Sequence, residues 1–494
     1  MLDVLTRRAS WWFAAPLIGL LFLTTNLPWH LDDYDQAKQA FTSLEMVDEG
    51  HWLYQHTPNE KIATKPPLVG WLSAATYGLT RSWEAAWRAP SIAAALALLL
   101  ILTRAASHAY GPMAGLLAMS AFGLNLLSPR LATLVRTDMP LALVVFLLGL
   151  KIWRKVRDRQ PWQLRDRLII FALLTAAMLI KGPIVYAFLL PGLVAFQWLR
   201  RDSAAAASAW SGWWPWIASL AVFLAWAAGG MVSVPGFYEQ VVLREFAGRF
   251  GDTVHRAQPI YFYLPHLLHK FAPWSVLLLA LAGMGCKTRL PWREKWRSLS
   301  PDVAWLVCWS LGGLLVMSLI PSKRVDRVFP IIPPLCLLLA AQFGMLSQET
   351  ASAGRVRRWG AVALIFAGVF TTAYAAQRVI ISYRGDDGAL ARFGATVREQ
   401  ARTKNRRYEV IGGQEEGLLL YLRRTRFMKP AEAVERWQAG ALDALIAPAE
   451  ELSPLRNDLP GMVPSVLEAA VIINDQERRY IFLERGAATR LSPE

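Results

Sequence analysis

A polar island near the start of the chain contains residue types that could do chemistry. It covers residues 32–68, where Asp35 and Lys38 stand one helical turn apart and Lys65 precedes two prolines. A carboxylate can remove a proton, and an ammonium can bind an anion. Apolar residues recur at the three-and-four spacing of a helix, which we expect to lie along a bilayer surface with Asp35 and Lys38 on its polar side: Ala37, Ala40, Phe41, Leu44 and Val47. An ordinary solvated loop would have a similar composition.

A second group of charges falls in a short turn between two apolar segments, at residues 321–327. Lys323, Arg324 and Arg327 place three cations within five residues of sequence. Cations at a membrane boundary are unfavourable unless an anion accompanies them. A lipid phosphate is the obvious anion, so this turn is a candidate phosphate site.

A third group lies at residues 235–263, where charged and aromatic side chains alternate. Such a mixture suits a phosphate and a sugar ring. Its ionisable members are Glu239, Arg244, Glu245, Arg249, His255 and Arg256.

The elements that must position these groups are apolar helices. With 494 residues, 54% of them hydrophobic, and a mean hydropathy of +0.28, the chain is too apolar for a soluble globular protein. Residues 11–28 are a first membrane-spanning candidate, and Lys181-Gly182-Pro183 should divide the apolar stretch 168–199 into a hairpin. We therefore expect an all-α polytopic membrane bundle of about 11–13 transmembrane helices.

The distribution of Lys and Arg indicates the orientation of this bundle. Positive charge is densest in connections such as 151–167, so the N-terminus is expected in the cytoplasm and the large loops 30–87 and 235–263 outside. The net charge of +16 is then explained by topology and anionic lipid, and nucleic acid is not an expected partner.

The composition becomes mixed and polar after the last apolar segment. We expect a transmembrane domain at residues 1–378, with helices in its outer loops, and a small α/β domain at residues 379–494 on the outer face. Short strands should begin at Tyr408, Ala444 and Ala470. Helical patterns fall between them, at residues 415–424 and 431–438. No catalytic group of residues is evident in this domain.

Three short motifs in the polar island carry a resemblance to a known class. They are Asp35-Gln36-Ala37-Lys38, Gly50-His51-Trp52 and Lys65-Pro66. In order and spacing they resemble the first outer loop of GT-C glycosyltransferases that use polyprenyl-phosphate sugars, a class that includes lipid A aminoarabinose transferases and protein O-mannosyltransferases. The resemblance implies Asp35 as the catalytic residue, Lys65 as a ligand of the donor phosphate and Lys38 as a substrate contact.

Later segments continue the resemblance. Residues 255–263, with Pro273-Trp274 after them, are similar to the second loop of the aminoarabinose-transferase branch. This implies substrate contacts for Arg249, His255 and Arg256. The cationic turn matches the class pattern for donor-phosphate binding by Lys323, Arg324 and Arg327, although Val328 replaces an expected tyrosine.

Two further positions match the class at the expected outer ends of spans. Asp138 precedes Met-Pro and Lys181 precedes Gly, and the resemblance implies that both contact or orient substrate. The residues alone also permit purely structural roles. Asp138 could simply pair with Arg136, and Lys181 could extend towards the membrane surface without a specific partner.

The resemblance implies an inverting transferase of GT-C fold in the bacterial inner membrane. Nucleotide sugars are normally absent outside the cytoplasm, so the activated sugar should arrive there on a lipid. The expected donor is undecaprenyl phosphate or another polyprenyl phosphate, and the expected acceptor is lipid A or another lipid or glycan of the cell envelope. Asp35 would be the general base for a hydroxyl acceptor, or would orient a phosphate acceptor.

Three alternatives compete with this function. Protein O-mannosyl transfer is the second enzyme hypothesis. A lipid or solute transporter, or a flippase, should have charged or broken segments at the bilayer midplane and related halves, whereas the charges here gather at the outer ends. A membrane scaffold would leave the Asp35 to Lys65 pattern unexplained.

No metal or other cofactor is firmly predicted. A zinc-type site in a relative pairs a glutamate just before the Lys-Pro motif with a loop histidine. Thr64 occupies the glutamate position here, and His255 alone is a weak ligand set, so a divalent metal is disfavoured. The particular sugar, the particular acceptor and the oligomeric state are not specified by the sequence.

Overall fold

The computed structural model describes residues 8–31, 33–57, 61–201, 203–246, 257–285, 292–349, 352–413, 416–473 and 476–486. The chain divides into two compact units. The first unit comprises Met1–Asn26 and Thr64–Arg378, and the second comprises Leu27–Ala63 and Val379–Glu494. The second unit therefore combines Leu27–Ala63, from the part of the chain before residue 378, with the C-terminal segment.

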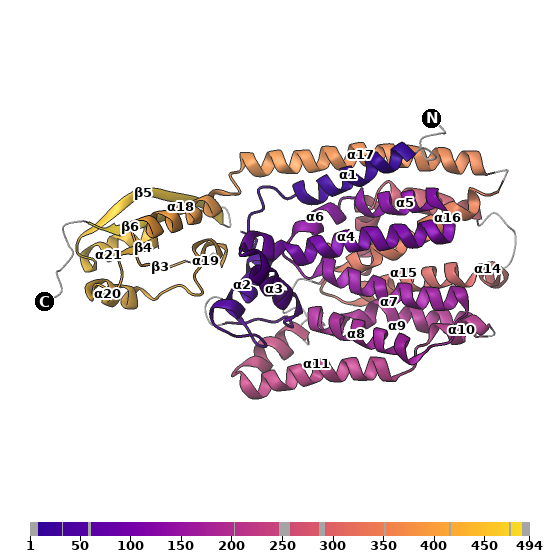
Figure 1. The fold of residues 1–494 in the computed structure, drawn as a ribbon, viewed down its shortest axis with the longest axis horizontal. Coiled ribbons are helices and arrows are strands. Elements are labelled where there is room, and N and C mark those ends of the chain that lie inside the picture. Colours follow the sequence, from indigo (N-terminus) through magenta and orange to yellow (C-terminus); the bar gives the residue numbers. More distant parts are fainter. Residues whose placement is uncertain are drawn as a thin grey trace. The chain divides into compact units, whose positions relative to one another are not determined.

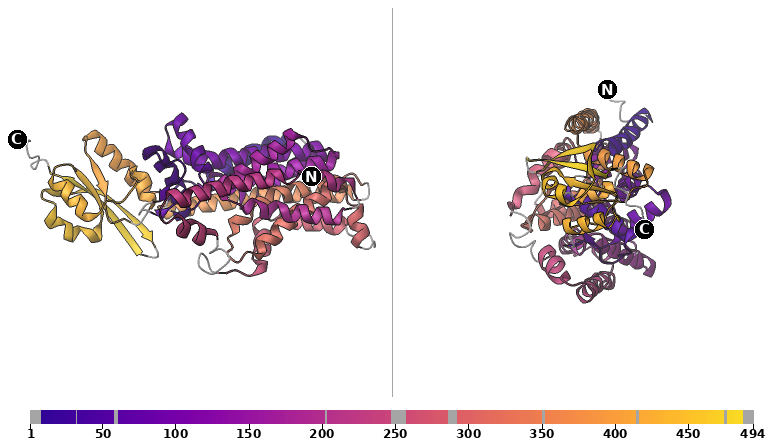
Figure 2. Two further views of the ribbon diagram at one scale, coloured as in Figure 1. Left: turned by 90° about the horizontal axis from the view of Figure 1, so that it is seen from below. Right: turned by 90° about the vertical axis from the view of Figure 1, so that its left-hand side faces the viewer.

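The first unit is a bundle of helices that run side by side (Figures 1 and 2). Its α-helices are α1 (Arg8–Thr24), α3 (Leu68–Thr80), α4 (Trp83–Tyr110), α5 (Pro112–Gly123), α6 (Ser128–Thr133), α7 (Asp138–Asp158), α8 (Leu164–Lys181), α9 (Ile184–Leu199), α10 (Ala204–Ala209), α11 (Trp214–Ser233), α12 (Tyr263–Lys270), α13 (Trp274–Gly285), α14 (Trp292–Ser298), α15 (Pro301–Leu319), α16 (Ile332–Leu346) and α17 (Ala353–Arg384). A π-helix, η2 (Tyr238–Phe246), and 3₁₀ segments η4 (Ile260–Phe262) and η5 (Val325–Ile331) complete it.

Length and apolarity identify the helices that could cross a bilayer. Within the described residues five segments meet both criteria, and a sixth does so if the pair α12 and α13, bent by 101°, counts as one span. Three more apolar helices are shorter: Ser10–Thr24, Pro112–Gly123 and Ile184–Leu199. The expected polytopic helical bundle is confirmed.

The expected hairpin between α8 and α9 is also confirmed. Lys181 ends α8, and Gly182 adopts a positive φ of 74° that a residue with a side chain would rarely adopt. Further along, α9 packs closely on α15, because a Cβ at Gly192 would lie 2.7 Å from the Cα of Trp309. The missing side chain at Gly192 therefore allows the two helix backbones to approach.

The second unit contains a four-stranded sheet with helices around it (Figure 1). Its strand order is β3-β4-β6-β5, in which β3 pairs parallel to β4 and the other neighbours are antiparallel. The elements are α2 (Tyr34–Asp48), β1 (His56–Thr57), β2 (Lys61–Ile62), α18 (Ala389–Thr403), β3 (Tyr408–Val410), α19 (Glu416–Leu422), α20 (Pro430–Gln438), β4 (Ala444–Pro448), η6 (Ala449–Glu451), α21 (Leu452–Asp458), β5 (Met462–Ile473) and β6 (Gln476–Arg485).

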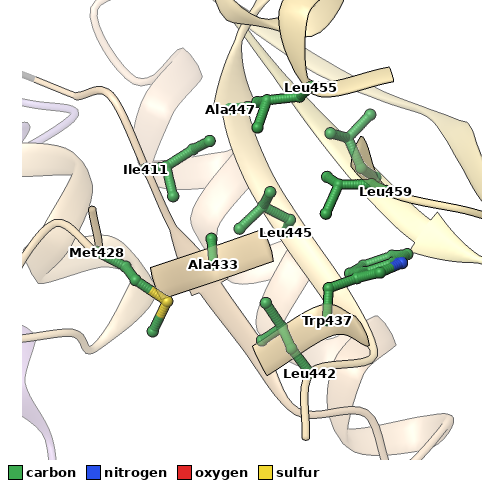
Figure 3. Packing of buried hydrophobic residues seen from close by; sticks show 10 residues of the cluster. Ile411, Met428, Ala433, Trp437, Leu442, Leu445, Ala447, Leu455 and Leu459 are labelled. Atoms are coloured by element: carbon green, nitrogen blue, oxygen red, sulfur yellow. The ribbon is translucent and has the colours of Figure 1, made fainter. Parts of the chain in front are cut away.

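One face of this sheet is covered by a small hydrophobic core (Figure 3). Trp437 of α20 packs with Leu442 and with Leu445 of β4, and its indole N–H donates to the carbonyl of Pro460 at 3.1 Å. Burying this large ring with its single donor satisfied stabilises the attachment of α20 to the sheet. The strands expected at Tyr408 and Ala444 begin at those residues. The strand expected at Ala470 begins earlier, at Met462, and β6 was not predicted.

The helix expected from Asp35 is α2, and most of its apolar stripe is buried within the protein. Ala37, Ala40, Phe41 and Leu44 are each no more than 1% exposed, whereas Val47 at the end of the stripe is 37% exposed. Within the second unit, α2 packs against α19. The backbone N–H of Leu31, just before α2, donates to the hydroxyl of Tyr421 in α19 at 2.5 Å.

Candidate functional site

Asp35 lies in the first turn of α2, which Asp33 caps. The Asp33 carboxylate accepts hydrogen bonds from the backbone N–H groups of Asp35 at 2.9 Å and Gln36 at 3.4 Å. The Asp35 side chain is half-buried in the first turn, at the positive end of the helix dipole. One turn later, the Lys38 ammonium lies 5.9 Å from the centre of the Tyr34 ring.

A second carboxylate in the same unit, Glu416, is influenced by the charge of Lys38. Glu416, the first residue of α19, is 8% exposed, and burial raises its pKa to about 7 although Lys38 and Lys61 act in the opposite direction. Since α2 packs on α19, the charge of Lys38 acts on the Glu416 carboxylate. Glu416 was not anticipated, because its position in an otherwise apolar helix gives no signal without the packing.

In the first unit, Asp138 and Lys181 form a direct ion pair. Asp138 begins α7 and Lys181 ends α8, and the Lys181 Nζ lies 2.5 Å from the Asp138 Oδ1. Both side chains are largely buried, and the charges of Lys65 and Arg136 also act on the Asp138 carboxylate. Three of the predicted site residues, Lys65, Asp138 and Lys181, are therefore neighbours in one electrostatic cluster.

The contacts of Asp138, Lys181 and Arg136 show which charged residues are direct partners. The direct partner of Asp138 is Lys181, whereas the Arg136 Nη1 lies 2.8 Å from the Asp326 Oδ2. Lys181 therefore has a specific carboxylate partner and does not extend to the surface alone. Arg130 adds a longer contact, with its Nη1 3.9 Å from the Asp326 Oδ1.

The cationic turn is anchored to the start of α7 through Asp326. This residue belongs to η5, which packs against α7, and its contact with Arg136 joins residues 190 positions apart. Asp326 was overlooked among the three cations, and it is a structural partner that limits where they can point. The turn that carries Lys323 is thereby held beside the helix that carries Asp138.

Lys323 is a buried cation in this turn. It is 5% exposed, and its Nζ donates to the backbone carbonyl of Gln258 at 2.8 Å. No carboxylate among the described residues forms an ion pair with it. Arg327 donates from Nη1 to the Ser322 carbonyl at 2.7 Å and to the Ser322 hydroxyl at 3.0 Å. Arg324 precedes η5 and is half-buried.

Three expected substrate contacts lie outside the described residues. They are Arg249, His255 and Arg256. The zinc-type pair of the relative does not fit this chain, because the Thr64 hydroxyl offers no carboxylate at the glutamate position.

Comparison with known proteins gives consistent matches. The family described as dolichyl-phosphate-mannose-protein mannosyltransferase matches residues 64–229. An undecaprenyl phosphate-α-4-amino-4-deoxy-L-arabinose arabinosyl transferase of Aeromonas salmonicida is 28% identical over 411 residues, which cover 77% of this chain and 69% of that protein. The protein of the same name from Pseudomonas savastanoi is 27% identical, over 69% of this chain and 62% of its own length.

The fold has a close counterpart among solved structures. The crystal structure of ArnT from Cupriavidus metallidurans bound to undecaprenyl phosphate matches 99% of this chain and 100% of its own, with a TM-score of 0.69 and 17% identity. At this identity the match concerns the fold, and it confirms the expected architecture of a transmembrane bundle with a small C-terminal α/β unit.

Proposed function

We infer that this chain, a membrane glycosyltransferase of the GT-C class that uses a lipid-linked sugar donor, transfers its sugar to lipid A or to another acceptor of the cell envelope. The donor would be undecaprenyl phosphate or another polyprenyl phosphate carrying the sugar. The transfer would take place on the periplasmic face of the bacterial inner membrane, with the N-terminus in the cytoplasm. The names of the two aminoarabinose transferases support this choice of donor.

One observation carries the proposal: Lys323 is buried with a backbone carbonyl as its described acceptor. A desolvated ammonium is costly unless an anion accompanies it. A lipid phosphate at headgroup level would supply that anion, and Arg324, Arg327 and Lys65 would share its charge. The contact between Arg136 and Asp326 keeps this turn beside Asp138.

These cations would act on the leaving group. As the bond between the anomeric carbon and the phosphate oxygen breaks, the electron pair passes to the phosphate. Positive groups already oriented towards that oxygen stabilise the growing charge without having to reorganise. Charge stabilisation of this kind is the main contribution we assign to Lys65, Lys323, Arg324 and Arg327.

Asp35 would act on the acceptor. A hydroxyl acceptor must lose its proton as its oxygen attacks the anomeric carbon, and the Asp35 carboxylate would take that proton in a single inverting displacement. A phosphate acceptor is already ionised, and Asp35 would then orient it. Lys38, Asp138, Lys181, Arg249, His255 and Arg256 are assigned to substrate binding.

Protein O-mannosyl transfer is the second candidate function. It is favoured by the description of the family that matches residues 64–229. The long loop at 235–263 favours a lipid or glycan acceptor. A panel of acceptors that includes lipid A, a glycan and a Ser/Thr-rich peptide separates these functions.

The proposal can be tested with the purified full-length protein and radiolabelled polyprenyl-phosphate sugars. Asp35→Asn should lower turnover on a hydroxyl acceptor by at least about a hundredfold while donor binding persists. Asp33→Asn is the matched control, because asparagine caps a helix as well as aspartate does, and its turnover should stay normal. Near-normal transfer by the Asp35→Asn protein would remove Asp35 from the mechanism, and failure of every lipid-linked donor would remove the proposed function.

A further inference from the structure

A carboxylate and two imidazoles converge in the loop that follows α2. Glu45 lies in the last turn of this helix, His51 lies in the connection, and His56 begins β1. The Glu45 Oε1 is 2.9 Å from the His51 Nδ1 and 3.0 Å from the His56 Nδ1. The mechanism proposed for sugar transfer uses none of these side chains.

The three ligand atoms are arranged as a small metal site requires. They lie within 4.8 Å of one another, and the two imidazole rings are inclined at 73° with their centres 5.2 Å apart. Zinc bound to nitrogen and oxygen at about 2.0–2.1 Å in tetrahedral geometry separates its ligand atoms by about 3.3 Å. Small side-chain movements would therefore open the cluster around an ion.

The surrounding structure fixes the carboxylate. Glu45 is 2% exposed, and its second oxygen, Oε2, accepts a hydrogen bond from the backbone N–H of His56 at 2.5 Å. This bond leaves Oε1 directed at the two imidazoles. Supporting hydrogen bonds that orient a ligand are typical of metal sites.

The loop that presents the histidines is also held in place. The Gln55 side chain donates to the His51 carbonyl at 2.9 Å, and the backbone N–H of Ala63 donates to the Gln55 carbonyl at 2.8 Å. Both imidazoles remain partly exposed, so an ion could enter and a water molecule could complete its coordination. A further carboxylate, Glu49, places its Oε2 3.7 Å from the His51 Nδ1 and adds negative charge.

We propose that Glu45, His51 and His56 bind a divalent transition metal of the zinc type. Two imidazoles and one carboxylate are the ligand set that several zinc enzymes use with water in the fourth position. The site differs from the zinc-type pair considered for Thr64 and His255, since all three ligands come from residues 45–56. The ion would tie the end of α2, the helix that carries Asp35, to β1, and would therefore stiffen the segment between them.

The alternative is that no metal binds and that hydrogen bonds alone hold these three side chains together. Each imidazole would then carry hydrogen on Nδ1 and donate it to Glu45. Glutamine at either histidine position could still donate a hydrogen bond to the carboxylate but would bind zinc poorly. This difference allows the two possibilities to be separated by binding alone, whether or not sugar transfer has been observed.

The test uses full-length protein in detergent, freed of metal by a chelator and then titrated with Zn²⁺ at neutral pH. We expect one zinc ion per chain by calorimetry and by elemental analysis, and a zinc-dependent rise in the unfolding temperature. The double variant His51→Gln/His56→Gln should weaken zinc binding by at least about tenfold to a hundredfold, because a lost ligand costs at least as much as a lost supporting group. Cobalt(II) should give the absorption bands of a tetrahedral site in the wild type and lose them in this variant.

A matched control replaces another close pair of histidines. His266→Gln/His269→Gln changes the same number of imidazoles in α12, and it should bind zinc as the wild type does. The proposal is overturned if the wild type takes up no zinc, or if the His51→Gln/His56→Gln protein retains the wild-type affinity. Circular dichroism establishes that each variant is folded, and Glu45→Gln provides a second test if the double variant does not fold.

Discussion

Lysines gather around an aspartate near each end of α7, but the charges are arranged differently at the two ends. At the C-terminal end, Lys151 and Lys155 each place Nζ 2.5 Å from a different oxygen of Asp166. The Lys155 ammonium also donates to the Pro161 carbonyl at 2.8 Å. Each cation of this cluster therefore contacts the carboxylate directly.

The charged side chains near the N-terminal end of α7 are arranged differently. Lys181 contacts Asp138 directly, whereas Lys65 and Arg136 act on the same carboxylate from outside that contact. Lys323, held beside α7 through Asp326 and Arg136, donates to a backbone carbonyl. Lys323 therefore differs from the lysines at the C-terminal end, and on our proposal an anionic substrate binds beside it. Identical residue types thus serve structure at one end and, on our proposal, binding at the other.

The largest expected effect comes from removing the buried cation. Lys323→Met should lower the rate of sugar transfer by about a hundredfold to a thousandfold, because one preorganised positive group is lost from the leaving group. Lys155→Met is the matched control at the other end of α7 and should transfer sugar at a normal rate. Steady-state kinetics on both purified variants measure the difference, and equal rates would mean that the two ends do not differ in function.

An intermediate effect on stability should follow from breaking the pair at the N-terminal end. Lys181→Met leaves the Asp138 carboxylate buried without its direct partner, which should cost about 3 kcal/mol of unfolding free energy. Adding Asp138→Leu should recover much of this loss, because the uncompensated charge is removed. Thermal unfolding in detergent measures both variants, and a double variant no more stable than Lys181→Met would contradict this reasoning.

The smallest effect concerns the closed cluster at the C-terminal end and its dependence on pH. The hydrogen bonds from Lys151 and Lys155 outweigh burial and lower the pKa of Asp166 to about 2. Since the folded value lies below the ordinary one of about 3.8, the stabilisation is complete above that pH and is lost as the pH falls through about 2. Asp166→Asn should therefore cost about 2 kcal/mol at neutral pH and converge with the wild type in acid.

Unfolding free energies measured across this pH range provide the check. A constant difference between the Asp166→Asn protein and the wild type at all pH values would show that the carboxylate charge is not responsible. Asp158→Asn, at the end of the same helix, serves as a control with a more exposed carboxylate.

Features encoded by neighbouring residues could be predicted from the sequence. The buried stripe of α2 follows from helical spacing, and the break between α8 and α9 follows from Gly182 and Pro183. Strand β6 was not recognised, because charged residues at 477–479 make up the first part of the strand, before its apolar residues. Its pairing with β4 and β5 supplies what its own sequence does not show.

Contacts between distant residues were beyond the sequence. The motifs indicated Asp138, Lys181 and Lys323 as individual positions, but they could not show that Lys181 pairs with Asp138 or that Arg136 pairs with Asp326. Such pairs depend on which helices pack together, and charge patterns alone permit several partners. The triad of Glu45, His51 and His56 was readable in principle, since two histidines follow a glutamate within eleven positions.

The grouping of Leu27–Ala63 with Val379–Glu494 has a consequence for how the protein is made. Helix α2 rests on α19, and Leu31 is hydrogen-bonded to Tyr421, so the early loop gains these supports only when the last part of the chain has emerged from the ribosome. The bundle can insert into the membrane while the loop that carries Asp35 is still unsupported. A nascent or prematurely terminated chain would accordingly lack these supports for the segment that carries Asp35, which would be among the last parts of the molecule to mature.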